Sequence, residues 1–187
     1  GATPRDDPAP APSLPRTPPH SCPHRYGTGL TGEYSDNWNG YLQSPQYDIP
    51  PSGATLQFAK WACMDSFDGD GAVLQYKVNN GGWQYFQPSI PGWYDGTKSS
   101  TWNNPFGNNE VWINDDCGLD TMSMREAPLD QWGGDSMTFR FWFRSDTCCQ
   151  SSTWGNDDFE GFYLDDFGIL IPNYSSNGSW LSPSVDI

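Results

Sequence analysis

Apolar and polar residues alternate along several short stretches of the chain, and this period of two predicts strands rather than helices. The two clearest stretches cover residues 137–144 and 161–171, which are rich in aromatic and aliphatic side chains. A polar loop that carries two adjacent cysteines and a group of acids separates them. Two core strands joined by such a loop are typical of a secreted β-sandwich.

Residues 54–64 show the alternation that a central strand requires. Leu56, Phe58 and Lys60 fall on one face, and the residues between them fall on the other. Both faces carry apolar side chains, so we expect both to be partly covered.

A hairpin is predicted next along the chain. Residues 72–78 read as a strand, and the two Asn and two Gly of 79–82 favour a tight turn because both residue types accept positive φ. Residues 83–86 are then the returning strand. The other predicted strand regions are 26–47, 110–114 and part of 119–132.

The composition agrees with an all-β chain. Gly (20 residues) and Pro (17) are frequent and leave few helix-forming segments, while the 16% of aromatic residues must supply much of the core. At 187 residues the chain fits one domain with tails. We therefore predict an antiparallel two-sheet sandwich over 26–172, a Pro-rich N-terminal arm over 1–25 and a polar tail over 173–187.

The net charge of the chain limits the classes of partner that it can bind. A formal charge of −14 argues against a nucleic-acid partner, because phosphate backbones require a cationic surface. It suits a cation-binding protein outside the cell. The sequence shows no apolar run of membrane length and no signal peptide, so we expect the mature form of an exported protein without membrane insertion.

The cysteines favour disulfides over a zinc site. None forms a C-x-x-C pair, and both histidines lie in the Pro-rich arm. In an oxidising compartment disulfides are the expectation, with free buried thiols as the alternative. We expect Cys63 to pair with one of the adjacent cysteines and Cys117 with the other, which leaves Cys22 over; the adjacent pair is Cys148 and Cys149.

The two ends of the chain carry their own predictions. The Pro-rich arm is either a flexible linker or a segment that docks on another protein surface, and docking on a neighbouring copy would be head-to-tail and could repeat into a fibre. The C-terminal tail contains two N-x-S sequons, at Asn173 and Asn177, which predict glycosylation if the source is eukaryotic.

A long Gly-, Asn- and Trp-rich excursion over 88–117 is a candidate recognition loop, since loops on a rigid sandwich often carry binding sites. Its aromatic residues could stack on sugar rings or on a partner. The alternative is that they cover the ends of the sandwich as core. The residues concerned are Trp93, Tyr94, Trp102 and Trp112.

Three separated segments resemble one protein family when read in order. They are KWACMDSFDGDGAVLQYKVNNGGW, PLDQWGGDSMTFRFWFRSD and EGFYLDDFGI. Together they are similar to the jelly-roll accessory domains of secreted immune-inhibitor-A-type metalloproteases, with MAM domains and reelin repeats as relatives. The resemblance covers residues 32–171. The zinc motif of the protease itself is absent from this sequence, so the resemblance implies the accessory jelly-roll fold without the catalytic machinery.

The same resemblance implies a structural Ca²⁺ near the acidic turn and the last strand. Calcium takes six to eight oxygen ligands, and crowded carboxylates without a cation would raise one another's pKa. A period of two along 161–171 puts Asp166 on the face shared with Phe162 and Leu164, so we favour Asp166 as a ligand. The alternative is that the acids are turn formers on a solvated surface. The predicted ligands are Asp65, Asp68, Asp70, Asp157, Asp158 and Asp166.

Catalysis is not expected. Two carboxylates could hydrolyse a glycoside, but the acids crowd on Gly-rich turns without an apolar pocket to raise the pKa of a general acid. The predicted sandwich contains no histidine for a Ser-His-Asp set.

The sequence leads to two hypotheses about function. The predicted function is that of a structural or adhesive extracellular subunit that self-associates or contacts neighbouring modules of a surface protein. The alternative is a carbohydrate-binding accessory module of a larger secreted hydrolase or protease.

Overall fold

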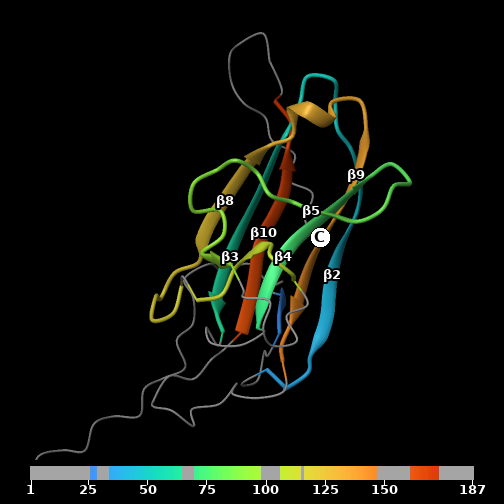
Figure 1. Ribbon diagram of the computed structural model, residues 1–187. Helices are drawn as coiled ribbons and strands as arrows, with labels where there is room; N and C mark the ends of the chain where they lie inside the picture. Colours follow the sequence, from blue (N-terminus) through green and yellow to red (C-terminus); the bar gives the residue numbers. More distant parts are fainter. Residues whose placement is uncertain are drawn as a thin grey trace, which may run out of the picture.

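The protein folds as two antiparallel β-sheets packed face to face (Figure 1). The computed structural model describes residues 26–28, 34–64, 70–97, 106–114, 116–146 and 161–172. The predicted arm (1–25) and C-terminal tail (173–187) lie outside the described residues. The all-β prediction is confirmed.

Each sheet has four strands. The first sheet has the order β1-β10-β3-β8, with β1 (Tyr26–Gly27), β10 (Gly161–Leu170), β3 (Thr55–Cys63) and β8 (Ser123–Pro128). The second has the order β2-β9-β4-β5, with β2 (Asn39–Asp48), β9 (Ser136–Arg144), β4 (Gly71–Val78) and β5 (Gln84–Tyr85). Strands from distant parts of the sequence lie side by side in both sheets, as in a jelly roll.

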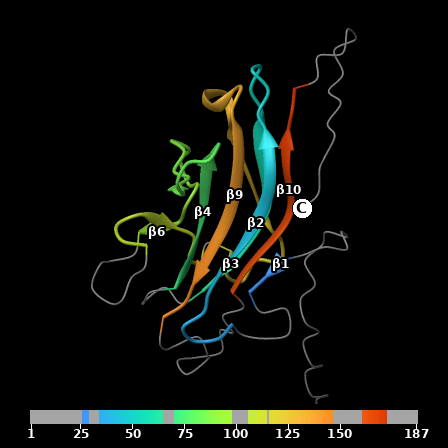
Figure 2. The same cartoon turned by 90° about the vertical axis from the view of Figure 1, so that its right-hand side faces the viewer.

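Two minor elements complete the described structure. A two-stranded ribbon of β6 (Gly96–Thr97) and β7 (Glu110–Val111) belongs to the predicted excursion, and a 3-10 turn, η1 (Asp130–Trp132), joins β8 to β9. Figure 2 shows the ribbon beside β4. Among the described residues, no helix is long and apolar enough to cross a membrane.

The core between the sheets is built from aromatic rings. Phe58 on β3 is fully buried and lies with its ring centroid 4.9 Å from that of Phe141 on β9, in an edge-to-face arrangement. It also contacts Trp93, Trp112 and Phe167. Such pairs add stabilisation beyond the apolar area they bury. The prediction that aromatic residues supply much of the core is confirmed.

The strand predictions hold best where the alternation is regular. Phe58 and Lys60 share the inward face of β3, as predicted, and both are fully buried. The 79–82 hairpin is present, with Asn79 at a φ of 51°. The returning strand is shorter than predicted, since only Gln84–Tyr85 pairs with β4.

The predicted inward position of Asp166 is wrong, because β10 contains a bulge. Its register against β3 shifts between Asp165 and Gly168, and Asp166 adopts a φ of 49°. The extra residue reverses the alternation, so Phe167 takes the inward face that Leu164 occupies before the bulge. Asp166 is exposed, and Asp165 is the buried acid of the pair.

The predicted disulfide pairing is also wrong. Cys63 at the end of β3 is bonded to Cys117, with 4.8 Å between their Cα atoms. The turn that contains Cys117 runs along the end of β3, where the Asp116 amide donates to the Ala62 carbonyl at 3.2 Å. That backbone contact brings the two cysteines together. The adjacent pair, Cys148 and Cys149, lies outside the described residues, as does Cys22.

A buried ion pair lies beside this disulfide. The Lys60 ammonium donates to Oδ2 of Asp116 at 2.7 Å, and both side chains are almost completely buried. The Ala62 amide also donates to Oδ2, at 2.9 Å, and the Ser123 hydroxyl donates to Oδ1 at 2.8 Å. Asp116 thus joins β3 to the start of β8, and its charge is compensated by hydrogen bonds as well as by the lysine.

We expect Phe58→Ala to lower the free energy of unfolding by about 3–5 kcal/mol, because it removes a ring shared by both sheets and leaves a cavity. Chemical denaturation with tryptophan fluorescence measures the change. The exposed Met124, on the outer face of the first sheet, supplies the control: Met124→Ala should change stability by less than about 0.5 kcal/mol. Equal effects of the two substitutions would contradict the described core.

We expect Asp116→Ala to destabilise the fold by about 3–5 kcal/mol, because it leaves the Lys60 charge buried. Lys60→Met should cost less, since Asp116 keeps its bonds from Ala62 and Ser123. Denaturant titration of the two variants makes the comparison. A larger loss for Lys60→Met would show that these two bonds do not support the carboxylate.

Candidate functional site

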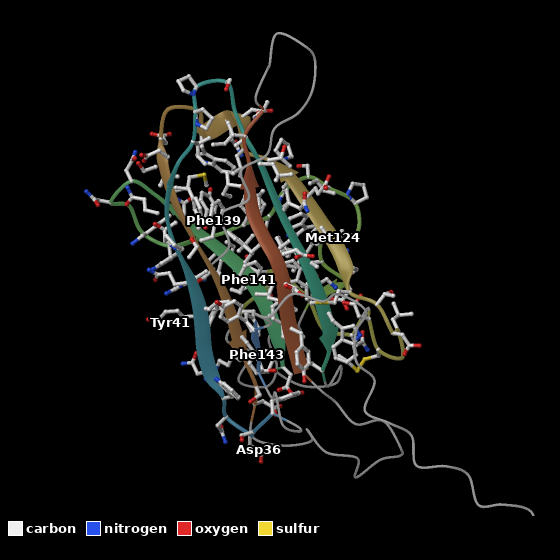
Figure 3. All side chains as sticks on the ribbon, turned by 180° about the vertical axis from the view of Figure 1, so that it is seen from behind. Asp36, Tyr41, Met124, Phe139, Phe141 and Phe143 are labelled. Atoms are coloured by element: carbon white, nitrogen blue, oxygen red, sulfur yellow. A yellow bond between two sulfur atoms is a disulfide. The ribbon has the colours of Figure 1, made fainter. Side chains whose placement is uncertain are left out.

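The outer face of the second sheet carries the candidate site. On β9, Phe139, Phe141 and Phe143 are buried between the sheets, so the alternation turns Arg140 and Trp142 outward. Figure 3 shows the three phenylalanines inside the sandwich and Tyr41 of β2 projecting away from it.

Arg140 lies at the centre of this face. Its Nε donates to Oε1 of Gln75 at 2.7 Å, and Gln75 is its cross-strand neighbour on β4. On the other side its neighbour is the exposed Gln43 of β2. The guanidinium carbon lies 4.2 Å from the ring centroid of Trp83 and 5.2 Å from that of Tyr41. The guanidinium is therefore held by one hydrogen bond and two cation-π contacts.

Five other side chains lie around Arg140. Tyr41 is 62% exposed and Trp83 is half-buried. The Lys77 ammonium lies 5.1 Å from the Trp83 ring centroid, so one indole contacts two cations. We refer to these residues as the Arg140 surface, which consists of Tyr41, Gln43, Gln75, Lys77, Trp83 and Arg140.

The hairpin after β4 positions Trp83. The Gly81 amide donates to the Val78 carbonyl at 2.9 Å and closes the turn. Asn79 ties the turn to the start of β9, since its side chain donates to Asp135 at 3.0 Å and accepts from the Ser136 amide at 3.1 Å. Trp83 is thus carried on a turn anchored to the sheet and not on a free loop.

One half of the outer face is covered and the other is open. The excursion around β6 and β7 packs Phe106 and Val111 against Val73, and the Trp142 ring lies 5.2 Å from that of Phe106. Beyond Trp142, Tyr41 and Gln43 of the Arg140 surface are exposed, whereas Gln75 is buried. The arrangement is an open platform with aromatic rings and amide groups.

The electrostatics of the platform differ from those of the whole chain. Within the part of the chain that the structure describes, Lys77, Arg140 and Arg144 form no ion pair, and all three project from the outer face. Burial lowers the pKa of the Arg140 guanidinium, which still remains charged at any physiological pH. The platform therefore presents positive charge and hydrogen-bond donors.

The aromatic residues predicted to bind a ligand do not form the site. Trp93, Tyr94 and Trp112 are buried, with 2%, 7% and 0% of their surface exposed. The Trp112 indole donates to the Trp93 carbonyl, and the Tyr94 hydroxyl donates to the Phe86 carbonyl at 2.8 Å. Burial raises the pKa of the Tyr94 phenol. The alternative, that these residues form core, is the correct one; Trp102 lies outside the described residues.

The predicted calcium ligands are not brought together in the described part of the chain. Asp70 is fully buried at the start of β4, where it accepts hydrogen bonds from the Tyr34 hydroxyl at 2.5 Å and the Asp146 amide at 2.7 Å. Asp166 lies five positions along β10 from Gly161, the partner of Cys63, and is thus about 16 Å along the strand from that end at ~3.3 Å per residue. The described residues contain no group of three or more metal-ligating side chains.

The remaining predicted positions lie outside the described residues. They are the calcium candidates Asp65, Asp68, Asp157 and Asp158 and the sequon residues Asn173 and Asn177.

Comparison with known proteins assigns no family to this chain. No protein-family model matches the chain, and no curated protein is similar to it in sequence. The resemblance to immune-inhibitor-A accessory domains, MAM domains and reelin repeats therefore stays a prediction. The signal that would have located the Arg140 surface is the alternation in 137–144, where Arg140 and Trp142 fall opposite three phenylalanines.

Proposed function

We propose that this chain is a non-catalytic extracellular module that binds carbohydrate through the Arg140 surface. The observation that carries the proposal is the gathering of Tyr41, Trp83 and Arg140 on the open half of the second sheet. It favours the carbohydrate-binding hypothesis over a purely structural role.

The chemistry of the surface suits a sugar. Aromatic rings offer apolar faces against which the C–H groups of a pyranose can stack, and they can do so with little loss of side-chain freedom. The exposed amide of Gln43 supplies both a donor and an acceptor for hydroxyl groups, while the buried Gln75 holds Arg140 in place. Few precisely placed polar groups among aromatic side chains are what small polar ligands require.

The other parts of the proposal rest on separate observations. The Cys63–Cys117 disulfide supports an oxidising compartment and hence an extracellular location. The lack of histidine over 26–172 supports a non-catalytic role, since the commonest general base is missing from that range. Assembly through the Pro-rich arm remains a prediction, because residues 1–25 lie outside the described structure.

Calcium binding by the acidic turn is a second part of the proposal. Asp70 supports it, because a fully buried carboxylate that accepts two hydrogen bonds comes directly after residues 65–69 in the chain. Asp65 and Asp68 would supply further carboxylates. We leave Asp166, which is exposed on β10, out of this proposed site.

The carbohydrate proposal predicts that the chain binds at least one glycan of a panel that spans neutral and acidic polysaccharides. Tyr41→Ala and Trp83→Ala should each weaken that binding at least about tenfold, or about 1.4 kcal/mol, because the first removes the exposed stacking ring and the second removes the ring that positions Arg140 and Lys77. Affinity electrophoresis finds the ligand and calorimetry gives the dissociation constants.

Met124→Ala is the matched control, since Met124 is exposed on the opposite side of the molecule (Figure 3) and should leave the affinity unchanged. Melting curves of all variants separate lost contacts from lost folding. Binding that survives both aromatic substitutions would overturn the assignment of the surface, and no binding across the panel would overturn the function.

The calcium proposal predicts that EDTA lowers the melting temperature by several degrees and that added Ca²⁺ restores it, because an ion bound only to the folded state stabilises that state. Asp68→Asn should reduce this difference, whereas Asp36→Asn, at an exposed acid outside the turn, should leave it unchanged. A melting temperature that is insensitive to EDTA would remove calcium from the proposal.

A further inference from the structure

The described cations are distributed unevenly over the molecule. Lysine and arginine total 9 residues against 23 acids. Three of the described cations, Lys77, Arg140 and Arg144, lie on the outer face of the second sheet. Lys60 is buried with Asp116, and Arg125 on β8 donates to the Trp93 carbonyl at 3.3 Å. Among the residues that the structure describes, the Arg140 surface thus brings two exposed-face cations, Lys77 and Arg140, together on one ring and can accept an anion.

The orientation of Arg140 determines which anions fit its remaining hydrogen-bond donors. Its Nε is occupied by Gln75, and its plane is held near two aromatic rings. The two Nη groups form the edge that remains for a ligand. Two parallel N–H donors on that edge match the two oxygens of a planar carboxylate.

A second cation lies within reach of the same ligand. The Lys77 ammonium and the Arg140 guanidinium contact one ring, that of Trp83, at 5.1 Å and 4.2 Å from its centroid. A ligand bound at Trp83 would therefore contact the compact charge of the Lys77 ammonium beside the planar guanidinium of Arg140. Neighbouring acidic sugars of one chain could therefore be bound at the same time.

We propose that the ligand of the Arg140 surface is an acidic polysaccharide that contains uronic acid residues. The inference rests on the proposed function and names its substrate class. Charge complementarity supports it, since Lys77 and Arg140 attract a polyanion that the net charge of −14 of the whole chain otherwise disfavours. Tyr41 contacts a sugar ring, Trp83 positions the two cations, and Arg140 binds the carboxylate.

The test compares one oligosaccharide in two forms. A short oligogalacturonate and its methyl-esterified form have the same rings, but only the first carries charge. We expect the acid form to bind about ten- to a hundredfold more tightly, the range that charged hydrogen bonds supply. Its dissociation constant should rise with NaCl concentration, whereas that of the ester should not.

Substitutions test which residues cause the difference in affinity between the acid and ester forms. Arg140→Gln should remove most of the preference for the acid form, and Arg140→Lys should restore it only in part because the ammonium cannot form the bidentate contact. Lys77→Met should reduce the preference for the acid form less than Arg140→Gln does. Met124→Ala should leave it unchanged. Melting curves confirm that each variant is folded.

Each contrary result has a distinct meaning. Equal affinity for both forms, weakened by Tyr41→Ala, would overturn the uronate inference and leave the proposed function intact. Tighter binding of a sulfated glycan than of the oligogalacturonate, with the same dependence on Arg140, would also overturn it. A preference for the acid form that persists in Arg140→Gln would exclude this surface as its cause. Absence of binding to every sugar would overturn both proposals.

Discussion

The packing of β9 is the constraint on which the rest of this structure depends. Phe139, Phe141 and Phe143 enter the core at alternate positions and contact side chains of the opposite sheet, Phe58 among them. A shift of one residue would bury Arg140 and expose the phenylalanines, so the register has no close competitor. The burial that stabilises the sandwich thereby also determines which side chains form the outer platform.

The ends of the sandwich are held by polar contacts. Near the end of β3, Asp116 bonds Lys60 and Ser123 while the adjacent Cys117 is bonded to Cys63. At the start of β4, Asp70 joins Tyr34 to the end of β9. A buried carboxylate is costly unless its oxygens are satisfied, and here each one is bonded to segments far apart in sequence. These carboxylates specify how loops meet the sheets.

The proposed function depends on the outer face of the second sheet. The second sheet combines exposed aromatic rings with cations that form no ion pair among the described residues, on a chain with a large excess of acids. The predicted binding loop over 88–117 instead contributes core, through Trp93 and Trp112, and covers part of the outer face through Phe106. The site is thus on the sheet and not on the excursion.

The sequence by itself determined the all-β class, the aromatic core, the strands with regular alternation and the hairpin after β4, because these depend on local periodicity and turn chemistry. Tertiary structure decided the partner of Cys63, the exposure of Asp166 and the burial of Trp93 and Tyr94. A bulge shifts the alternation without a local signal, and a disulfide depends on which loop returns to a strand end. The Arg140 surface belongs to both categories. The sequence of β9 predicts that Arg140 and Trp142 point outward. The contacts of Arg140 with Tyr41 and Trp83 depend on the order of the strands in the sheet, which pairs segments far apart in the chain and cannot be deduced from any one segment.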